Sequence, residues 1–184
     1  MAAPHLTTLR GISDAAIYAL TEDSVSALTY GAKVDISGIQ EITITPEGES
    51  SEIKGDDGVV ASRGKIQKAT VSVKAARLSL DVLSKVYGSS VVDSGSGTTE
   101  VATLTIAGTD VPPQFKIAGQ CTQVDTGLAD ATFVIYKCTY TGGGEIALQT
   151  DEYATMNFDC DAVLTINNNK IADIVYHETL VPLA

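Results

Sequence analysis

Two runs of alternating residues decide the fold of this chain, Glu41-Ile-Thr-Ile-Thr45 and Lys68-Ala-Thr-Val-Ser-Val-Lys-Ala75. In each run apolar side chains alternate with polar ones, which is the period of a β-strand with one buried face. A helical pattern follows at Leu80–Tyr87, with Ser79 as a candidate N-cap and Gly88 placed to end the helix. The whole stretch therefore predicts a strand, a connection, a second strand and a short helix.

The connection between the two runs, residues 46–64, is predicted to be a long acidic loop. Pro46 and several glycines interrupt any regular element, and the carboxylates keep the segment in water. A polar loop of this length is costly to order unless something binds it, so we expect it to contact a partner. Its acidic residues are Glu47, Glu49, Glu52, Asp56 and Asp57.

Composition places the chain in the mainly β class. The 184 residues contain 5% aromatic residues, no Trp and many Thr, Ser and Gly, which is typical of a strand-rich protein with tight turns. The formal net charge of −11 makes ordinary nucleic-acid binding through Lys and Arg unexpected. Two uses of the negative charge stay open: solubility, or a channel wall along which DNA slides without sticking.

The rest of the chain predicts further strands and several irregular segments. Residues 1–13 and 177–184 are expected to be terminal arms, and residues 89–100 a flexible loop. Gly38 is a predicted bulge, and Asn167–Lys170 a hairpin turn, because Asn tolerates the left-handed conformation. The predicted strands are Ala15–Leu20, Val101–Ala107, Phe115–Cys121, Thr132–Tyr140, Met156–Ile166 and Ile171–Tyr176, and Leu28–Ile36 is expected to be the approach to the strand that follows it.

Two of these strands carry more information than the others. Thr132–Tyr140 has apolar groups on both faces, with Phe133 and Ile135 on one side and Tyr140 on the other, which predicts a central strand. In Met156–Ile166 every second residue is apolar, and Asp159 and Asp161 lie in the polar row between them. The glycine-rich segments around Gly95 and Gly142 are expected to be hinges or turns, since neither has the sequence of a phosphate loop.

Candidate catalytic or metal-binding residues do not form a recognised constellation. His5 and His177 are the only histidines, and neither accompanies a nucleophile motif. Asp159 and Asp161, or Asp56 and Asp57, would need further ligands to hold a cation. We therefore expect no enzymatic activity, metal or cofactor.

The cysteines and the N-terminus bear on the cellular environment. Cys121, Cys138 and Cys160 are far apart and odd in number, so we expect free thiols, buried at Cys138 and Cys160, in a reducing cytosol. The sequence shows neither a signal peptide nor an apolar run of membrane-spanning length, and synthesis in the cytoplasm is expected.

The order of these features resembles the major tail tube proteins of long-tailed bacteriophages. The resemblance rests on Tyr18-Ala-Leu-Thr21, Tyr30-Gly31, Pro46-Glu-Gly-Glu49, Asp56-Asp-Gly58 and the strand leading into Leu80–Gly88. It covers the first half of the chain, and the second half only in strand pattern and length. It implies a β-sandwich or barrel, flanked by one short helix, in a single tube-like domain spanning 1–184.

The resemblance also implies a structural function. Members of this family form hexameric rings that stack into a hollow tail tube, through which the DNA passes without specific binding. The expected partners are other copies of the chain and the tape measure, tail terminator and tail tip or baseplate proteins; the expected location is the virion tail, after assembly in the host cytoplasm. The inter-subunit contacts would involve Pro46, Glu47, Glu49, Ser50, Glu52, Asp56 and Asp57, and the acidic candidates for the lumen are Glu41, Asp159 and Asp161.

Two other functions stay open at this point. A tube protein of a contractile tail or injection apparatus would share the fold. A capsid-decorating or adhesion β-sandwich would be a binding module, although adhesion favours exposed aromatic residues, and this chain has no Trp and 7 Tyr.

Overall fold

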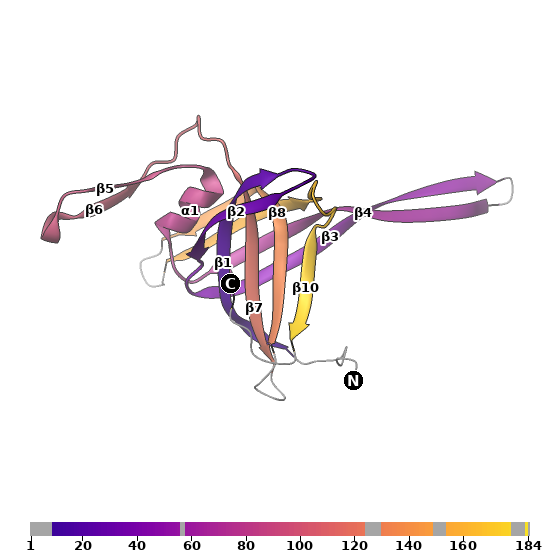
Figure 1. The fold of residues 1–184 in the computed structure, drawn as a ribbon, viewed down its shortest axis with the longest axis horizontal. Coiled ribbons are helices and arrows are strands. Elements are labelled where there is room, and N and C mark those ends of the chain that lie inside the picture. The colour runs from indigo at the N-terminus through magenta and orange to yellow at the C-terminus, as the bar shows by residue number, and fades with distance from the viewer. Residues whose placement is uncertain (1–8, 56–57, 124–129, 149–153, 178–182, 184) are drawn as a thin grey trace.

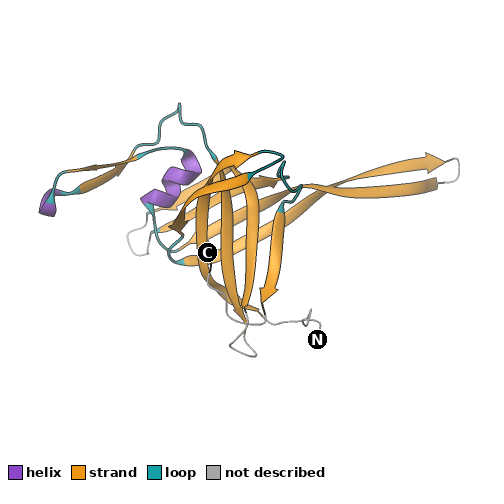
Figure 2. Ribbon diagram, viewed as in Figure 1, coloured by secondary structure: helices purple, strands orange, loops and turns teal. Residues whose placement is uncertain are grey.

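The computed structural model describes residues 9–55, 58–123, 130–148, 154–177 and 183. Strands dominate these residues, so the predicted mainly β class is confirmed (Figure 2). The strands are β1 Leu9–Asp23, β2 Leu28–Asp35, β3 Ile39–Gly55, β4 Gly58–Ala75, β5 Val91–Ser94, β6 Val101–Leu104, β7 Gln114–Gln123, β8 Asp130–Ala147, β9 Thr155–Val163 and β10 Ala172–His177; the α-helix is α1 Leu80–Tyr87, and a 3-10 turn spans Gly97–Thr99.

Eight of the strands form one antiparallel sheet in the order β2-β1-β7-β8-β9-β4-β3, with β10 as an additional partner of β8. One edge of β8 is shared, because residues 130–135 pair with β10 and residues 138–147 pair with β9. Strands β3 and β4 cross behind β1, β7 and β8 (Figure 1), and side chains from both groups of strands belong to one buried cluster. The sheet therefore folds over on itself and encloses the core.

The core is built by the predicted alternation. Met156, Phe158, Cys160 and Ala162 of β9 are all buried, as the period of two requires. Phe158 packs edge to face against Phe115 of β7, with ring centroids 6.4 Å apart. The alternation was predicted to continue to residue 166, but β9 ends at Val163, and Ile166 is 58% exposed.

Helix α1 forms where its cap signals predict it. The Ser79 hydroxyl accepts a hydrogen bond from the Val82 N–H, and Gly88 ends the helix in the left-handed conformation, at φ 78°. A side chain at Gly88 would meet the Val111 carbonyl oxygen at 2.3 Å, so the packing also requires glycine. Val82, Leu83 and Val86 are buried and join the core between the sheet's halves.

The predicted loop at 46–64 is wrong, because this segment is part of a β-hairpin. Strands β3 and β4 pair from Ile39 with Ala75 to Gly55 with Gly58, with register shifts after Ile39, after Glu47 and after Ile53. Pro46 fits within β3 because β3 is an edge strand, where the missing N–H need not break the ladder.

Beyond the sheet the same hairpin continues as a two-stranded projection. Strand β4 pairs with β9 only over Lys68–Ala75, so residues 48–55 and 58–66 pair only with each other. We call this projection the ribbon; it extends away from the body of the molecule (Figure 1). The many polar residues of this segment led to the prediction of a loop. In a two-stranded ribbon, however, both faces are exposed to water, so polar side chains are compatible with strands on both faces.

The predicted loop at 89–100 is also wrong over most of its length. Strands β5 and β6 pair from Val91 with Leu104 to Ser94 with Val101, and the 3-10 turn lies between them. The predicted strand from Val101 accordingly ends at Leu104 rather than at residue 107. This second hairpin projects from the opposite side of the body to the ribbon (Figure 1).

The terminal arms are shorter than predicted. Residues 9–13 belong to β1, where Leu9 pairs with Gln123, and residues 1–8 lie outside the described residues. At the other end His177 is the last residue of β10, and Leu183 packs against a small cluster that contains Tyr18. Residues 178–182 and 184 are likewise outside the described part of the chain.

Strand β8 corrects two predictions. It contains one more residue than β7 between the pairs Ile117–Ile135 and Phe115–Cys138, and this bulge reverses the alternation. Tyr140 therefore packs against the core on the side of Ile135, not on the opposite side as predicted. The glycines at 142–144 form a second bulge inside β8 rather than a hinge or turn.

Two turns were predicted with the wrong role. Asn169 adopts φ 55° in the predicted turn at 167–170, but the strand that follows pairs with β8, so β9 and β10 do not form a hairpin. Gly38, a predicted bulge, lies in the turn between β2 and β3, at φ 71°.

Candidate functional site

The outer side of β3, β4 and β9, facing away from the core, carries a row of polar residues on each strand. The strand register aligns these rows, so that Glu41 lies opposite Lys74, and Thr70 opposite Asp161. The three predicted lumen candidates, Glu41, Asp159 and Asp161, all lie on this side. We call it the polar face; its residues are Glu41, Thr43, Thr45, Glu47, Lys68, Thr70, Ser72, Lys74, Asn157, Asp159, Asp161 and Val163.

Two lysines of β4 hold most of the carboxylates of the polar face. The Lys74 ammonium lies 2.9 Å from the Glu41 carboxylate. The Lys68 ammonium lies 3.2 Å from Glu47 and 3.1 Å from Asp161, so it bridges β3 and β9. The side chain of Asp159 has no ion pair among the described residues.

Two of these contacts favour the charged form of a side chain. Hydrogen bonds from Lys74 and then Thr43 lower the pKa of Glu41. Hydrogen bonds to Asp161 and Glu47 raise the pKa of Lys68. With four carboxylates and two ammonium groups, the polar face is a surface of fixed, net negative charge.

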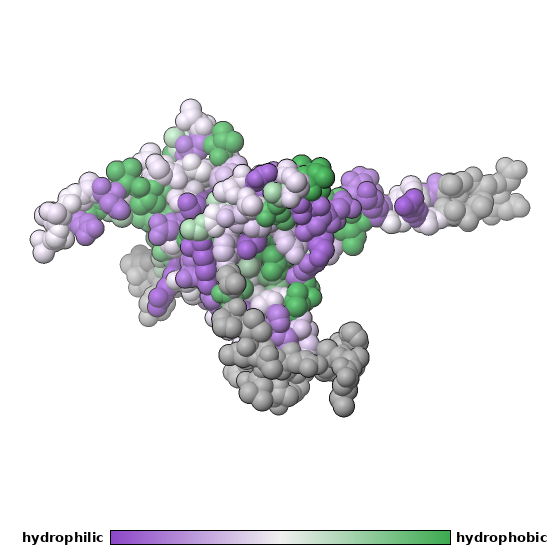
Figure 3. Space-filling view, viewed as in Figure 1, coloured by the Kyte–Doolittle hydropathy of each residue, from purple (hydrophilic) through white to green (hydrophobic). Residues whose placement is uncertain are grey.

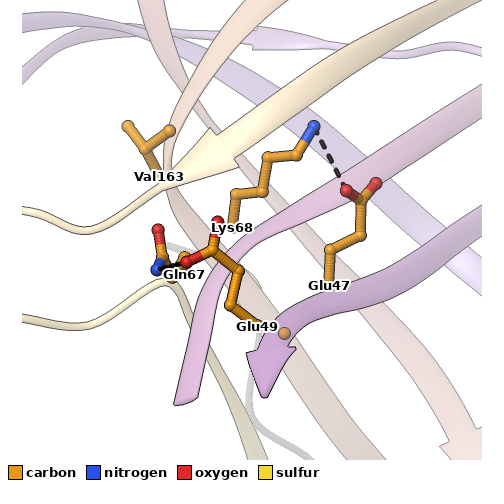
Figure 4. A pocket seen from close by; sticks show the side chains of 6 residues that line it. Glu47, Glu49, Gln67, Lys68 and Val163 are labelled. Atoms are coloured by element: carbon orange, nitrogen blue, oxygen red, sulfur yellow. Dashed lines mark hydrogen bonds and ion pairs between the residues drawn. The ribbon is translucent and has the colours of Figure 1, made fainter. Parts of the chain in front are cut away.

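A shallow pocket marks the point where the ribbon leaves the body (Figure 4). Gln67 is an extra residue in β4, because Glu47 pairs with Lys68 and the next residue of β3 pairs with Ile66. The Gln67 amide donates a 2.6 Å hydrogen bond to Glu49, next to the ion pair between Lys68 and Glu47. A bulge increases the local twist, so these contacts set the direction of the ribbon.

The predicted inter-subunit residues lie on β3, not on a loop. Those described are exposed to solvent, and Ser50 and Glu52 lie opposite the small residues Gly64 and Ser62 of β4. Asp56 and Asp57 lie outside the described residues. The members on β3 are Pro46, Glu47, Glu49, Ser50 and Glu52.

Sequence reasoning did not select the cations that neighbour these acids. Lys68 and Lys74 belong to the alternating run that predicted β4, so their side of the strand was predictable. Their partners were not, because pairing with Glu41, Glu47 and Asp161 depends on the register of three strands. Arg63 lies in the segment that the sequence predicts to be a loop, and Lys65 lies just beyond it, so the pattern of alternation did not point to either cation.

The remaining candidates that the structure describes are His177 and the cysteines. The Nε2 atom of His177 lies 2.9 Å from Thr132 Oγ1, within hydrogen-bond distance. Cys138 and Cys160 are buried free thiols, as predicted, and burial raises the pKa of Cys138. No group of three or more potential metal ligands occurs among the described residues.

Comparison with known proteins adds no assignment, because no family model and no characterised protein matches the chain. The described helices include none that is both long enough and apolar enough to cross a membrane.

Proposed function

We propose that this chain is a structural virion protein that polymerises, as stacked hexameric rings, into the hollow tail tube of a long-tailed bacteriophage. The phage DNA would pass through the tube without specific binding. The partners would be other copies of the chain and, at the ends of the tube, the tape measure, terminator and tail tip proteins. The assembled protein would be located in the virion tail.

The observation that carries the proposal is the ribbon. A two-stranded ribbon is marginally stable in water by itself, and this one extends beyond the sheet with polar residues on both faces. None of the ribbon residues whose burial is described belongs to the buried core. A projection that contributes so little to its own fold is well suited to reach a neighbouring subunit, as a tube of stacked rings requires.

Two further features support the proposal. Strands β2, β3 and β10 each have an edge without a partner strand among the described residues. Such edges pair readily with other chains, and pairing between copies would extend the sheet around a ring. The polar face offers a net negative surface that would repel the phosphates of DNA in a lumen.

The test compares the natural chain with a variant lacking the end of the ribbon. In the variant Asn-Gly replaces residues 50–64 and closes the hairpin after the pair Glu49 and Lys65, because this dipeptide favours a two-residue turn. The core is untouched, so a folded protein that no longer forms tubes is expected. A control, Val25→Ser, changes an exposed residue of the β1–β2 turn.

Negative-stain electron microscopy and solution mass, measured over a range of concentrations, give the result. Rings or tubes from the natural chain and the control, with single particles from the shortened variant, would support the proposal. Normal tubes from the shortened variant would refute the role of the ribbon. A natural chain that stays monomeric at every concentration would refute the polymerisation itself.

A further inference from the structure

The polar face continues onto one side of the ribbon. Glu47 and Glu49 are two residues apart on β3, and both line the pocket at the root of the ribbon (Figure 4). The register places Lys65 opposite Glu49, on the same side. Arg63 lies opposite Ser51 and lines a second hollow together with Lys65. We call this side of the ribbon, with its two neighbouring cations, the cationic side.

The two cations have no acid of their own. Neither Arg63 nor Lys65 has an ion pair among the described residues, and both are exposed. Glu49, opposite Lys65, instead accepts the 2.6 Å hydrogen bond from the Gln67 amide. The surface of the ribbon next to the body is mainly hydrophilic (Figure 3). In a chain with a net charge of −11, exposed cations without a partner are the groups through which one copy can attract another.

The ribbon turns its cationic side away from the direction of the polar face. Strands β3 and β4 cross at the root of the ribbon (Figure 1), where Gln67 forms the bulge. Two-stranded ribbons twist more than wider sheets do, and a bulge adds to the twist. The cationic side can therefore face the polar face of a neighbouring copy that has the same orientation.

Two acids at the β8 border of the polar face also lack an ion pair among the described residues. Asp159 is a member of the polar face, and Glu145 of β8 lies on the same side because it pairs with Asn157. At Gly143, beside them, an added Cβ would lie 2.1 Å from the Asp159 carboxylate. Glycines in a strand allow the close approach of another backbone, so this border can receive the ribbon. We call Asp159 and Glu145 the acidic pair.

The spacing of the acids matches the spacing of the cations. Arg63 and Lys65 are two residues apart on one strand, a distance of about 7 Å. Asp159 and Glu145 are diagonal neighbours on two paired strands, about 7–8 Å apart. The cations cannot reach the acids of their own chain, because Asp159 pairs with Ser72, which is about 30 Å from Arg63 along β4.

We propose that the cationic side of the ribbon of one copy binds the acidic pair of a second copy. The inference rests on the proposed function in that the partner of the ribbon is another copy of the chain. Glu41, Glu47 and Asp161 keep their lysine partners in this contact. Because the two surfaces are different parts of the chain, the contact is head to tail, and it therefore closes a ring or extends from copy to copy.

A charge-exchange experiment tests the contact. The ribbon variant is Arg63→Glu with Lys65→Glu, and the acceptor variant is Glu145→Lys with Asp159→Lys. Sedimentation velocity should show self-association weakened about tenfold or more in each variant alone, because like charges then meet. An equimolar mixture should recover most of the association, since every ribbon then meets a site of opposite charge.

Matched variants separate docking from a general effect of charge. Asp93→Lys with Glu100→Lys reverses two other exposed acids that lack an ion pair among the described residues. Arg77→Glu with Lys85→Glu reverses two cations outside the ribbon. Both controls should associate like the natural chain. Circular dichroism of every variant verifies the fold.

A milder acceptor variant keeps the test decisive if the lysine variant does not fold. Glu145→Gln with Asp159→Asn removes both charges without enlarging either side chain, and it should also weaken self-association. The same variant checks a different occupant of the acidic pair, a divalent cation. If calorimetry with calcium chloride showed binding that this variant loses while its self-association stayed normal, the docking contact would be overturned.

The outcomes distinguish this inference from the proposed function. Weakened association of the ribbon and acceptor variants, with recovery on mixing, would support the docking contact. Tubes or rings that these variants form as well as the natural chain, or equal weakening in the matched controls, would overturn the docking contact and leave the proposed function standing. A natural chain without any self-association would overturn both.

Discussion

Removal of the Asp23 carboxylate is expected to destabilise the fold strongly. This side chain is 5% exposed and lies 2.8 Å from the ammonium group of Lys137, which is 13% exposed. It also accepts hydrogen bonds from the backbone N–H groups of Ile166, at 2.9 Å, and Asn167, at 3.2 Å. One carboxylate thus joins the end of β1 to β8 and to the turn before β10.

The magnitude follows from what the substitution leaves behind. Asp23→Ala leaves the Lys137 charge and two N–H groups without their acceptor, and breaking a buried ion pair typically costs about 3–5 kcal/mol. With a urea m-value of about 2 kcal/mol per molar, the unfolding midpoint should fall by about 1.5–2.5 M. Asp23→Asn keeps an acceptor oxygen but loses the charge, so a smaller loss of about 1–3 kcal/mol is expected.

The same carboxylate should contribute a pH dependence. Burial alone would raise the pKa of Asp23, but the hydrogen bonds from Lys137, Ile166 and Asn167 outweigh it and lower the pKa below its ordinary value of 3.8. A lowered pKa stabilises the fold above pH 3.8, and this contribution is lost as the pH falls through the folded-state value. The difference in unfolding free energy between the natural chain and Asp23→Asn should therefore shrink from pH 7 to pH 3.

Urea unfolding followed by circular dichroism gives the measurement, with Glu41→Gln as the matched control. Glu41 forms an ion pair of similar length, 2.9 Å, with Lys74, but both of these side chains are half exposed. Removing the Glu41 charge should therefore leave the unfolding midpoint unchanged. If Asp23→Ala shifted the midpoint no more than Glu41→Gln does, the reasoning from burial would be refuted.

Three further predictions concern the sheet. Gly119→Ala should lower stability by about 1–3 kcal/mol in the same assay, because the new methyl group would lie 2.1 Å from the Phe133 ring unless that ring moves; unchanged stability would contradict it. Burial and the hydrogen bond to Asp173 raise the pKa of Tyr136 to about 12, so ultraviolet titration of the natural chain should contain a late transition that Tyr136→Phe removes. The Cys138 thiol should resist alkylation in the folded protein and react after unfolding in urea, and rapid labelling of the native chain would show that it is accessible.

Cap residues and the alternation of apolar and polar residues correctly predicted the elements that depend on neighbouring residues in the sequence. The cap residues Ser79 and Gly88 determine both ends of α1, and the alternation in β9 assigns Phe158 to the core and Asp159 to the opposite side. The mainly β class and the shared face of Asp159 and Asp161 follow from the same period of two. These predictions needed no knowledge of which strands are neighbours.

The errors arose where the partner strand decides the structure. Pro46 reads as a breaker, yet it is compatible with an edge strand, and the sequence does not say that β3 is an edge. The turn around Asn169 was predictable from its left-handed conformation, but pairing of the next strand with β8 was not. The ion pairs of Lys68 likewise needed the register of β3, β4 and β9.

The location of the core makes the assembly experiments interpretable. The buried cluster lies between the halves of the sheet and contains none of the ribbon residues whose burial is described, while Leu104 is the only described residue of β5 or β6 packed against it. Because stability resides in that cluster, the body should fold before either projection finds a partner. Changes at the ribbon should then alter association while the unfolding midpoint stays constant, whereas Asp23→Ala should lower the midpoint.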